Sequence, residues 1–225
     1  MADFAVQRKN MVESQVRPSD VTDRRVVRAM LEIPREAFVP AAARAIAYMD
    51  ESIPLGPVGA GRGGRALMAP RVLAKMIQAL DIGDKANVLV VGAATGYASA
   101  VLARLAARVV AIESDAAMVA AARAALAGLD ATNVSVETAA GGLAAGWPQQ
   151  APYDAILIDG AVPAIPDALL DQLKDGGRLV AVIADAGLGR AMQWRRLGGM
   201  FDQRAVFDAG APRLPGFERA AQFVF

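Results

Sequence analysis

The chain has 225 residues, 55% of them hydrophobic, which is long enough to bury a full core as one domain. It carries 24 lysines and arginines against 23 aspartates and glutamates, so its charge gives no reason to expect nucleic acid or an anionic membrane as a partner. It has no cysteine and no histidine, which excludes disulfides, Cys/His zinc sites, thiol nucleophiles and acid–base chemistry by imidazole.

The first fifty residues are predicted to be largely helical, with a break at Pro18. Ser19 or Asp20 is placed to cap the helix that follows, because both side chains can accept a hydrogen bond from a free backbone N–H. Pro34 ends that helix, since proline disfavours α geometry in the residue before it. The first ten residues are too polar for a secretory signal, so we expect a cytoplasmic protein.

Residues 53–65 are rich in glycine and proline and are predicted to form a loop. Pro70 then opens a helix that runs to about Leu80. We expect a single domain in which residues 1–80 form a helical extension with a substrate loop, and residues 81–225 form the core.

The core alternates apolar strands with helices, and the window at residues 88–103 is too short to span a bilayer. This alternation predicts an α/β, Rossmann-like fold with a mainly parallel, doubly wound sheet. Helices are expected directly after the first strand and over residues 116–126 and 166–173. The expected strands are residues 88–91, 108–113, 134–138, 153–159, 177–183, 201–207 and 220–225.

A glycine-containing turn follows the first of these strands, at the edge of the sheet where such folds bind ligands. No lysine lies near it, which argues against a phosphate-binding P-loop, and Tyr97 stands where a dinucleotide-binding motif requires its third glycine. The spacing from Gly92 to Gly96 suits S-adenosylmethionine (SAM) better. The expected cofactor contacts in this turn are Gly92, Ala93, Ala94, Thr95 and Gly96.

Glu113 ends the second strand and therefore lies at the same edge of the sheet. A carboxylate there can accept hydrogen bonds from both ribose hydroxyls of an adenosine ligand. The alternative is an acid that caps the helix beginning near Ala116. We favour the ribose role and expect the adjacent Ser114 to line the same site.

The absence of histidine and cysteine is compatible with methyl transfer from SAM. The methyl group of SAM is already activated by a positively charged sulfur, and a carboxylate acceptor is ionised at neutral pH. The protein then needs only to hold the two reactants in line, by proximity and orientation.

Several segments resemble one known family over most of the chain. They are residues 12–15, 23–30, 33–40, 47–50, 88–103, 151–156, 163–173 and 175–180, and they resemble those of the protein-L-isoaspartate O-methyltransferases. The N-terminal segments are the specific part, because SAM-binding folds in general lack them. The resemblance implies methyl esterification of L-isoaspartyl residues in aged proteins, with SAM as cofactor and isoaspartyl-containing proteins or peptides as substrates.

Three positions depart from that family's pattern. Met68 stands where the family has a serine that serves the site, and methionine has no hydroxyl to donate. Ala94 replaces the middle glycine of the SAM turn; at positive φ its methyl group would cost about 1 kcal/mol, and glycine there would tighten cofactor binding. The family's Gly-Asp-Gly reads Gly141-Gly142-Leu143, so an acid that contacts the cofactor is missing.

Asp159 is a fourth difference, because it ends the fourth strand where the family has a small neutral residue or threonine. It either replaces the missing acid or caps the following turn. Arg62 and Arg65 lie in the glycine-rich loop, where solvated charges are the favoured interpretation over anion binding. Two alternatives to isoaspartyl methylation stay open: a methyltransferase with a different acceptor, and a non-catalytic homologue that acts through protein contacts.

Overall fold

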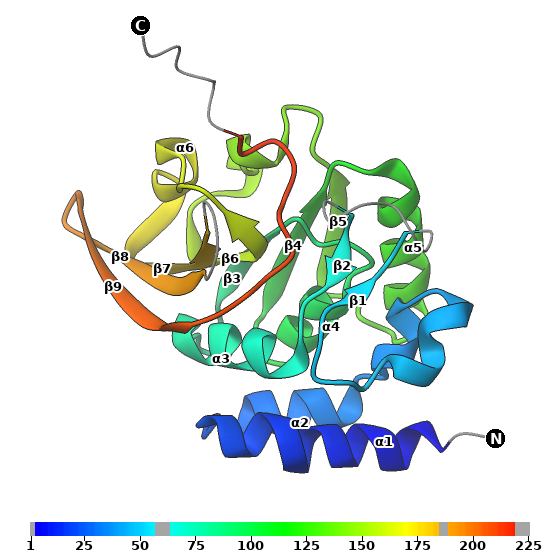
Figure 1. Ribbon diagram of the computed structural model, residues 1–225. Coiled ribbons are helices and arrows are strands. Elements are labelled where there is room, and N and C mark those ends of the chain that lie inside the picture. Colours follow the sequence, from blue (N-terminus) through cyan, green and yellow to red (C-terminus); the bar gives the residue numbers. More distant parts are fainter. Residues whose placement is uncertain (1–2, 57–63, 185–188, 219–225) are drawn as a thin grey trace, which may run out of the picture.

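One large β-sheet forms the centre of the computed structural model, which describes residues 3–56, 64–184 and 189–218 (Figure 1). Within those residues the sheet has seven strands in the order β5-β4-β3-β6-β7-β8-β9. Strands β3 to β7 are parallel, and β8 and β9 extend the sheet antiparallel, which confirms the predicted α/β fold. The bounds are β3 (Asn87–Val91), β4 (Arg108–Glu113), β5 (Val134–Thr138), β6 (Tyr153–Val162), β7 (Leu173–Ile183), β8 (Arg190–Leu197) and β9 (Met200–Asp208).

Helices cover both faces of this sheet, so its central strands are apolar on both sides. On one face a core joins α3 (Pro70–Leu80), α4 (Tyr97–Ala103) and α5 (Ala116–Ala127) to the strands. On the other face a second core holds α6 (Asp167–Leu170). In Figure 1, α3 lies below the sheet and α6 above it. No helix of the described residues is long and apolar enough to cross a bilayer.

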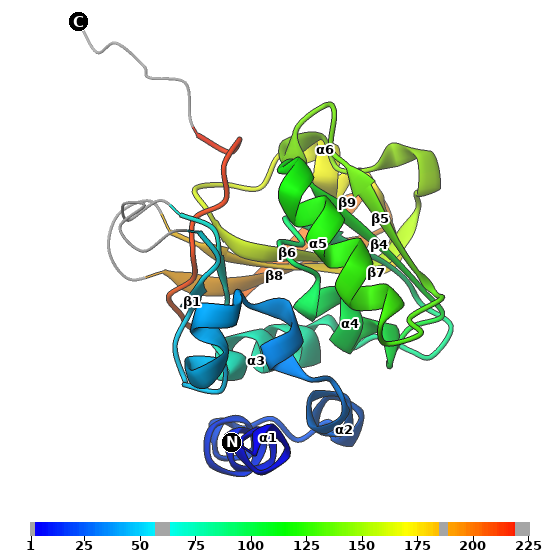
Figure 2. The same ribbon diagram turned by 90° about the vertical axis from the view of Figure 1, so that its right-hand side faces the viewer.

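The N-terminal helices α1 (Phe4–Met11) and α2 (Arg24–Glu32) lie beneath α3 and α4 and contribute to the first core (Figures 1 and 2). The expected cap of α2 at Ser19 or Asp20 is wrong. Asp23 caps the helix, because its carboxylate accepts a 2.8 Å hydrogen bond from the backbone N–H of Arg25. Asp20 instead adopts a left-handed conformation at φ 63°.

At three other places the structure differs from the prediction or adds an element to it. The segment predicted as a loop, residues 53–65, instead begins with a short strand, β1 (Ile53–Pro54), which pairs antiparallel with β2 (Ala66–Leu67). The helix expected at residues 166–173 is shortened to α6, because β7 begins already at Leu173. Strand β8 has no counterpart in the prediction, and the strand expected at residues 220–225 lies outside the described residues.

The strand order reverses at β3, which has β4 on one side and β6 on the other. In open α/β sheets ligands bind at the carboxyl ends of the strands beside such a reversal. Val91 of β3 pairs with Ile112 of β4 and with Ile158 of β6. The next residue of each strand therefore lies at one edge of the sheet, and these residues are Gly92, Glu113 and Asp159.

Candidate functional site

The turn after β3 is held against β4 by its own backbone. The N–H groups of Gly92 and Ala93 donate to the carbonyl of Ile112 at 2.9 and 3.0 Å. Gly96 has a φ of 96°, and a side chain there would meet the Cβ of Ala122 on α5 at 3.2 Å. Only glycine fits that position without strain, so the turn is a rigid edge of the site.

Ala94 has a φ of 50°, which confirms the positive value considered from the sequence. An L-residue in this region pays about 1 kcal/mol relative to glycine. The backbone N–H of Ala94 donates to Oε2 of Glu113 at 2.8 Å, so the strained residue also orients the carboxylate. That glycine at position 94 would tighten cofactor binding stays a prediction.

Glu113 is fully buried and accepts hydrogen bonds on both carboxylate oxygens. Its Oε1 accepts from the backbone N–H groups of Ser114 and Asp115 at 2.8 and 3.2 Å. It does not cap α5, because Asp115 does so by accepting from the backbone N–H groups of Ala117 and Met118. The capping alternative for Glu113 is therefore wrong, and the ribose role stays a prediction.

Arg65 occupies the other side of that carboxylate, and the expectation of a solvated loop charge is wrong for it. Its side chain is 10% exposed, and its Nη2 donates to Oε2 of Glu113 and, at 2.8 Å, to the carbonyl of Gly92. Because both charges are buried, either one without the other would be a buried charge that lacks a partner, which strongly destabilises the folded state. Arg62, the other arginine considered, lies outside the described residues.

Asp159 lies at the end of the same row and is 7% exposed. Its Oδ1 is buried and has no hydrogen-bond partner within the described ranges. Burial raises the pKa of Asp159 to about 6, although the positive charges of Arg65 and Arg35 act in the opposite direction. An unpartnered buried oxygen of this kind is suited to a ligand that brings a hydrogen-bond donor.

The remaining predicted contacts divide between the site and its surroundings. Gly142 and Leu143 follow β5, and the N–H of Ala139 binds the carbonyl of Glu113 at 2.9 Å, which places this turn beside the acid. Gly142 has a φ of 84°, and a side chain there would enter open space. Thr95 differs, because its hydroxyl donates to the carbonyl of Phe38 at 2.6 Å and so fastens the turn to the N-terminal segment.

Two functional neighbours escaped the sequence analysis. Arg35 is fully buried and donates to the carbonyls of Ala47 at 2.8 Å and Met68 at 2.7 Å, with its guanidinium 4.8 Å from the ring centre of Tyr97. Met68 is buried there and offers its backbone carbonyl rather than a hydroxyl. We call Arg35, with the two carbonyls that it binds, a brace between these segments. The available signal in the sequence was an arginine in the segment 33–39, whose other residues are apolar except Glu36.

Leu214 is the second missed neighbour, and it covers the turn. The segment carrying it runs beside β6, with hydrogen bonds from the N–H of Ala161 to the carbonyl of Pro212 and from the N–H of Leu214 to the carbonyl of Ala161. A Cβ added at Gly92 or Gly160 would lie 2.8 or 2.6 Å from the side chain of Leu214. Both glycines are needed because the leucine packs directly on the backbone.

These residues fit a ligand that combines a sugar with an amino acid. In the described part of the chain, three polar side chains lie along one edge of the sheet. They are the buried carboxylate of Glu113, Asp159 with its unpartnered Oδ1, and Arg65, whose Nε and Nη1 are buried and have no partner. Arg65 contacts Glu113 at this edge, and Leu214 packs on the backbone of Gly92 and Gly160. No cluster of acidic residues among the described positions is suited to a metal ion.

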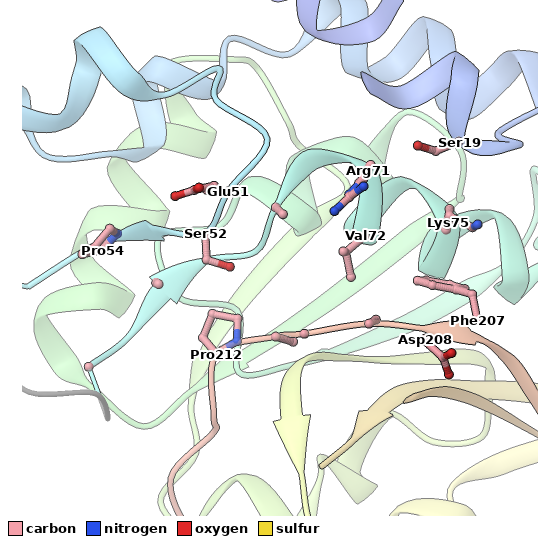
Figure 3. Close-up of a pocket in the computed structure, with 16 residues that line it drawn as sticks. Ser19, Glu51, Ser52, Pro54, Arg71, Val72, Lys75, Phe207, Asp208 and Pro212 are labelled. Atoms are coloured by element: carbon pink, nitrogen blue, oxygen red, sulfur yellow. The ribbon is translucent and has the colours of Figure 1, made fainter. Parts of the chain in front are cut away.

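A groove of about 840 Å³ runs beside this edge, between α3 and the segment at residues 207–212 (Figure 3). Gly64 and Ala66, the neighbours of Arg65 in the sequence, are among its lining residues, and Arg65 itself is not. Figure 3 shows Arg71 and Lys75 on the α3 side and Asp208 on the opposite wall. The groove is therefore lined by charged side chains of both signs.

Comparisons with known proteins agree on one family. Residues 6–208 match the family model described as Protein-L-isoaspartate(D-aspartate) O-methyltransferase (PCMT). Protein-L-isoaspartate O-methyltransferase 1 of Rhodopseudomonas palustris is 41% identical over 86% of this chain and 76% of its own length. Protein-L-isoaspartate O-methyltransferase of Methylorubrum extorquens is 44% identical over 82% of this chain and 77% of its own length.

Two solved structures share the fold. A protein-L-isoaspartate O-methyltransferase matches with a TM-score of 0.81 at 23% identity, over 93% of this chain and 66% of its own. A Plasmodium falciparum protein, described as a putative protein-L-isoaspartate O-methyltransferase in complex with S-adenosyl-L-homocysteine, matches with a TM-score of 0.72 at 16% identity. That match covers 95% of this chain and 99% of the other.

Proposed function

The chain belongs to the protein-L-isoaspartate(D-aspartate) O-methyltransferase family of SAM-dependent enzymes, and we propose that it methylates the free carboxylate of isoaspartyl residues in proteins or peptides. The family match over residues 6–208 is the observation that carries this proposal. The row formed by Gly92, Glu113 and Asp159 supports it, because it supplies the polar groups that SAM requires at the reversal of the strand order.

The proposed cofactor contacts follow from the groups that each residue offers. Glu113 and Ser114 receive the ribose, beside the turn formed by residues 92–96. Gly142 and Leu143 line the adenosine end of the site, next to the acid. Asp159 offers its unpartnered oxygen to the ammonium group of the methionine part, so it takes over the task of the acid missing at position 142.

SAM supplies a methyl group on a positively charged sulfur when it is bound. The protein's part is to orient the acceptor carboxylate toward that methyl group and to exclude water, and no proton has to be moved. Leu214 and Phe217 are buried apolar residues of the segment that covers the edge, and they exclude water from the site. The acceptor peptide is proposed to lie in the groove between α3 and residues 207–212 (Figure 3), which is lined in part by Gly64 and Ala66, the sequence neighbours of Arg65.

Incubation of the purified protein with labelled SAM and an isoaspartyl peptide is expected to give a base-labile methyl ester. The same peptide with a normal aspartyl linkage is the matched control and is expected to remain unlabelled. Protein that binds S-adenosylhomocysteine (SAH) but forms no ester above background would contradict the proposed acceptor.

A different acceptor is favoured by one observation, the buried Met68 beside the brace formed by Arg35. Methionine has no hydroxyl that could donate a hydrogen bond to the methyl acceptor. The acceptor would therefore be bound differently here than by the serine of the family's pattern. Labelling a cell extract with the protein and labelled SAM separates the two proposals. Label confined to isoaspartyl sites would exclude the alternative acceptor.

Asp159→Asn is expected to change how stability depends on pH. The folded pKa of Asp159, about 6, lies above its ordinary value of 3.8, so ionisation of the carboxylate above pH 6 destabilises the folded state. This cost disappears as the pH falls from 6 toward 4. Asparagine has no such cost, and one pKa unit corresponds to about 1.4 kcal/mol, so the variant should be more stable than the parent by about 3 kcal/mol at pH 7.5.

Urea denaturation at pH 4 and at pH 7.5 measures this difference, which should be near zero at pH 4. If Asp159 also binds the cofactor's ammonium group, the variant should bind SAH more weakly at pH 7.5. An equal stability difference at both pH values would show that Asp159 does not titrate in this range.

A further inference from the structure

Arg65 is placed where it competes with the cofactor. Its Nη2 donates to Oε2 of Glu113, the oxygen that also accepts from the N–H of Ala94. Oε1 is already engaged by the backbone of Ser114 and Asp115. Each oxygen of this buried carboxylate therefore already accepts at least two hydrogen bonds, and a ribose hydroxyl that binds Glu113 has to replace the guanidinium of Arg65.

The displaced guanidinium needs another anion, because a buried charge without a partner costs several kcal/mol. Its Nε and Nη1 are buried and have no partner among the described residues, so it carries unused donors toward the site. Gly64 and Ala66, its neighbours in the sequence, are among the residues that line the groove proposed for the acceptor. The acceptor's carboxylate, if it lies at this part of the groove, is an anion close to residue 65 that can take the place of Glu113.

We propose that Arg65 exchanges partners during the reaction, from Glu113 when the ribose position is free to the acceptor's carboxylate when the cofactor is bound. This inference rests on the proposed function, in which the acceptor is an isoaspartyl carboxylate. A planar guanidinium can hold one carboxylate oxygen and leave the other directed at the methyl group. Arg65 is then a substrate-binding residue, and Glu113 is its resting partner.

The chemistry of methyl transfer makes the exchange reversible. The acceptor's carboxylate oxygen forms a bond to the methyl carbon as the sulfur–methyl bond breaks, and the electron pair of that bond stays on sulfur. The carboxylate becomes a neutral ester, so Arg65 loses its anion in the product complex. Its return to Glu113 displaces the ribose and favours release of SAH.

The test compares Arg65→Met with Arg65→Lys, and with Arg178→Met as a control at the opposite edge of the sheet, where Arg178 pairs with Asp81 at 2.9 Å. Titration calorimetry measures the binding of SAH and of 5′-methylthioadenosine, which has the adenosine part but no amino acid. Arg65→Met should tighten both ligands by about fivefold or more, the low end of typical coupling between linked binding events. Arg178→Met should change neither.

The second measurement is the KM for an isoaspartyl peptide at saturating SAM. Arg65→Met should raise it by about 30-fold, as expected for loss of one member of a buried charge pair, and Arg65→Lys should restore part of the loss. Unchanged affinity for both adenosine ligands would overturn the competition for Glu113. If Arg65→Met binds SAH more weakly than the parent but binds 5′-methylthioadenosine equally well, Arg65 contacts the carboxylate of the cofactor's amino-acid part. That result would overturn the exchange.

The two measurements also separate this inference from the proposed function. If the parent protein esterifies no isoaspartyl peptide, the proposed acceptor fails, while the two calorimetric titrations still decide whether Arg65 competes with the ribose. If the parent is active but the KM is the same in Arg65→Met, the transfer of Arg65 to the acceptor is overturned and the proposed function stands.

Discussion

Glu113→Gln is expected to weaken SAH binding by about a hundredfold. The carboxylate is fully buried, and Oε2 faces the N–H of Ala94 and the guanidinium of Arg65. An amide places either an NH₂ group against these donors or, after rotation, an NH₂ group against the N–H groups of Ser114 and Asp115. A hydrogen bond to a charged group contributes about 1.5–3 kcal/mol, so loss of the one that the ribose makes in place of Arg65 accounts for the factor.

Titration calorimetry with SAH checks this expectation, and circular dichroism at the same temperature shows that the variant is folded. Glu32→Gln is the matched control, because Glu32 forms an exposed pair with Arg28 on α2. The control should bind SAH like the parent. Binding by folded Glu113→Gln within threefold of the parent would remove Glu113 from the ribose site.

Arg35→Ala is expected to lower the free energy of unfolding by about 3–5 kcal/mol, because it removes the donor of two carbonyls and a large buried side chain. The guanidinium joins three separate segments, through the carbonyls of Ala47 and Met68 and the ring of Tyr97. Alanine leaves both carbonyls without this donor and leaves a cavity beside the ring. For a chain of this length the midpoint of thermal unfolding should fall by roughly 10 °C.

Urea denaturation of the parent and the variant measures the change. Arg28→Ala is the control, since Arg28 has an 82% exposed side chain and an exposed ion pair contributes little. A loss of less than about 1 kcal/mol in Arg35→Ala would mean that the backbone carbonyls find other donors. Arg35→Lys should retain part of the stability, because lysine keeps the charge but cannot reach both carbonyls in one plane.

The parts of the fold that were predicted from the sequence are those with a strong local pattern. Strand β4 was predicted with its observed bounds, and β3 within one residue, because strands buried on both faces consist of uninterrupted apolar residues. Glu113 was identified for the same reason, as the charged residue that ends such a run. Strand β8 was missed because arginines interrupt its apolar pattern at 190, 195 and 196, and it lies toward the edge of the sheet.

The sequence by itself determined the fold class, the family and the row of residues at the strand ends, because these depend on periodicity and on short motifs. Only the tertiary structure decided what each of these residues contacts. Arg65 reaches Glu113 across 48 positions of the chain, and Leu214 packs on Gly92 from the far end of it. No local sequence pattern predicts such contacts, because they form only when the sheet edge, the loop and the last segment pack against one another. Charged side chains that become buried in this packing are stable only where they pair with an opposite charge.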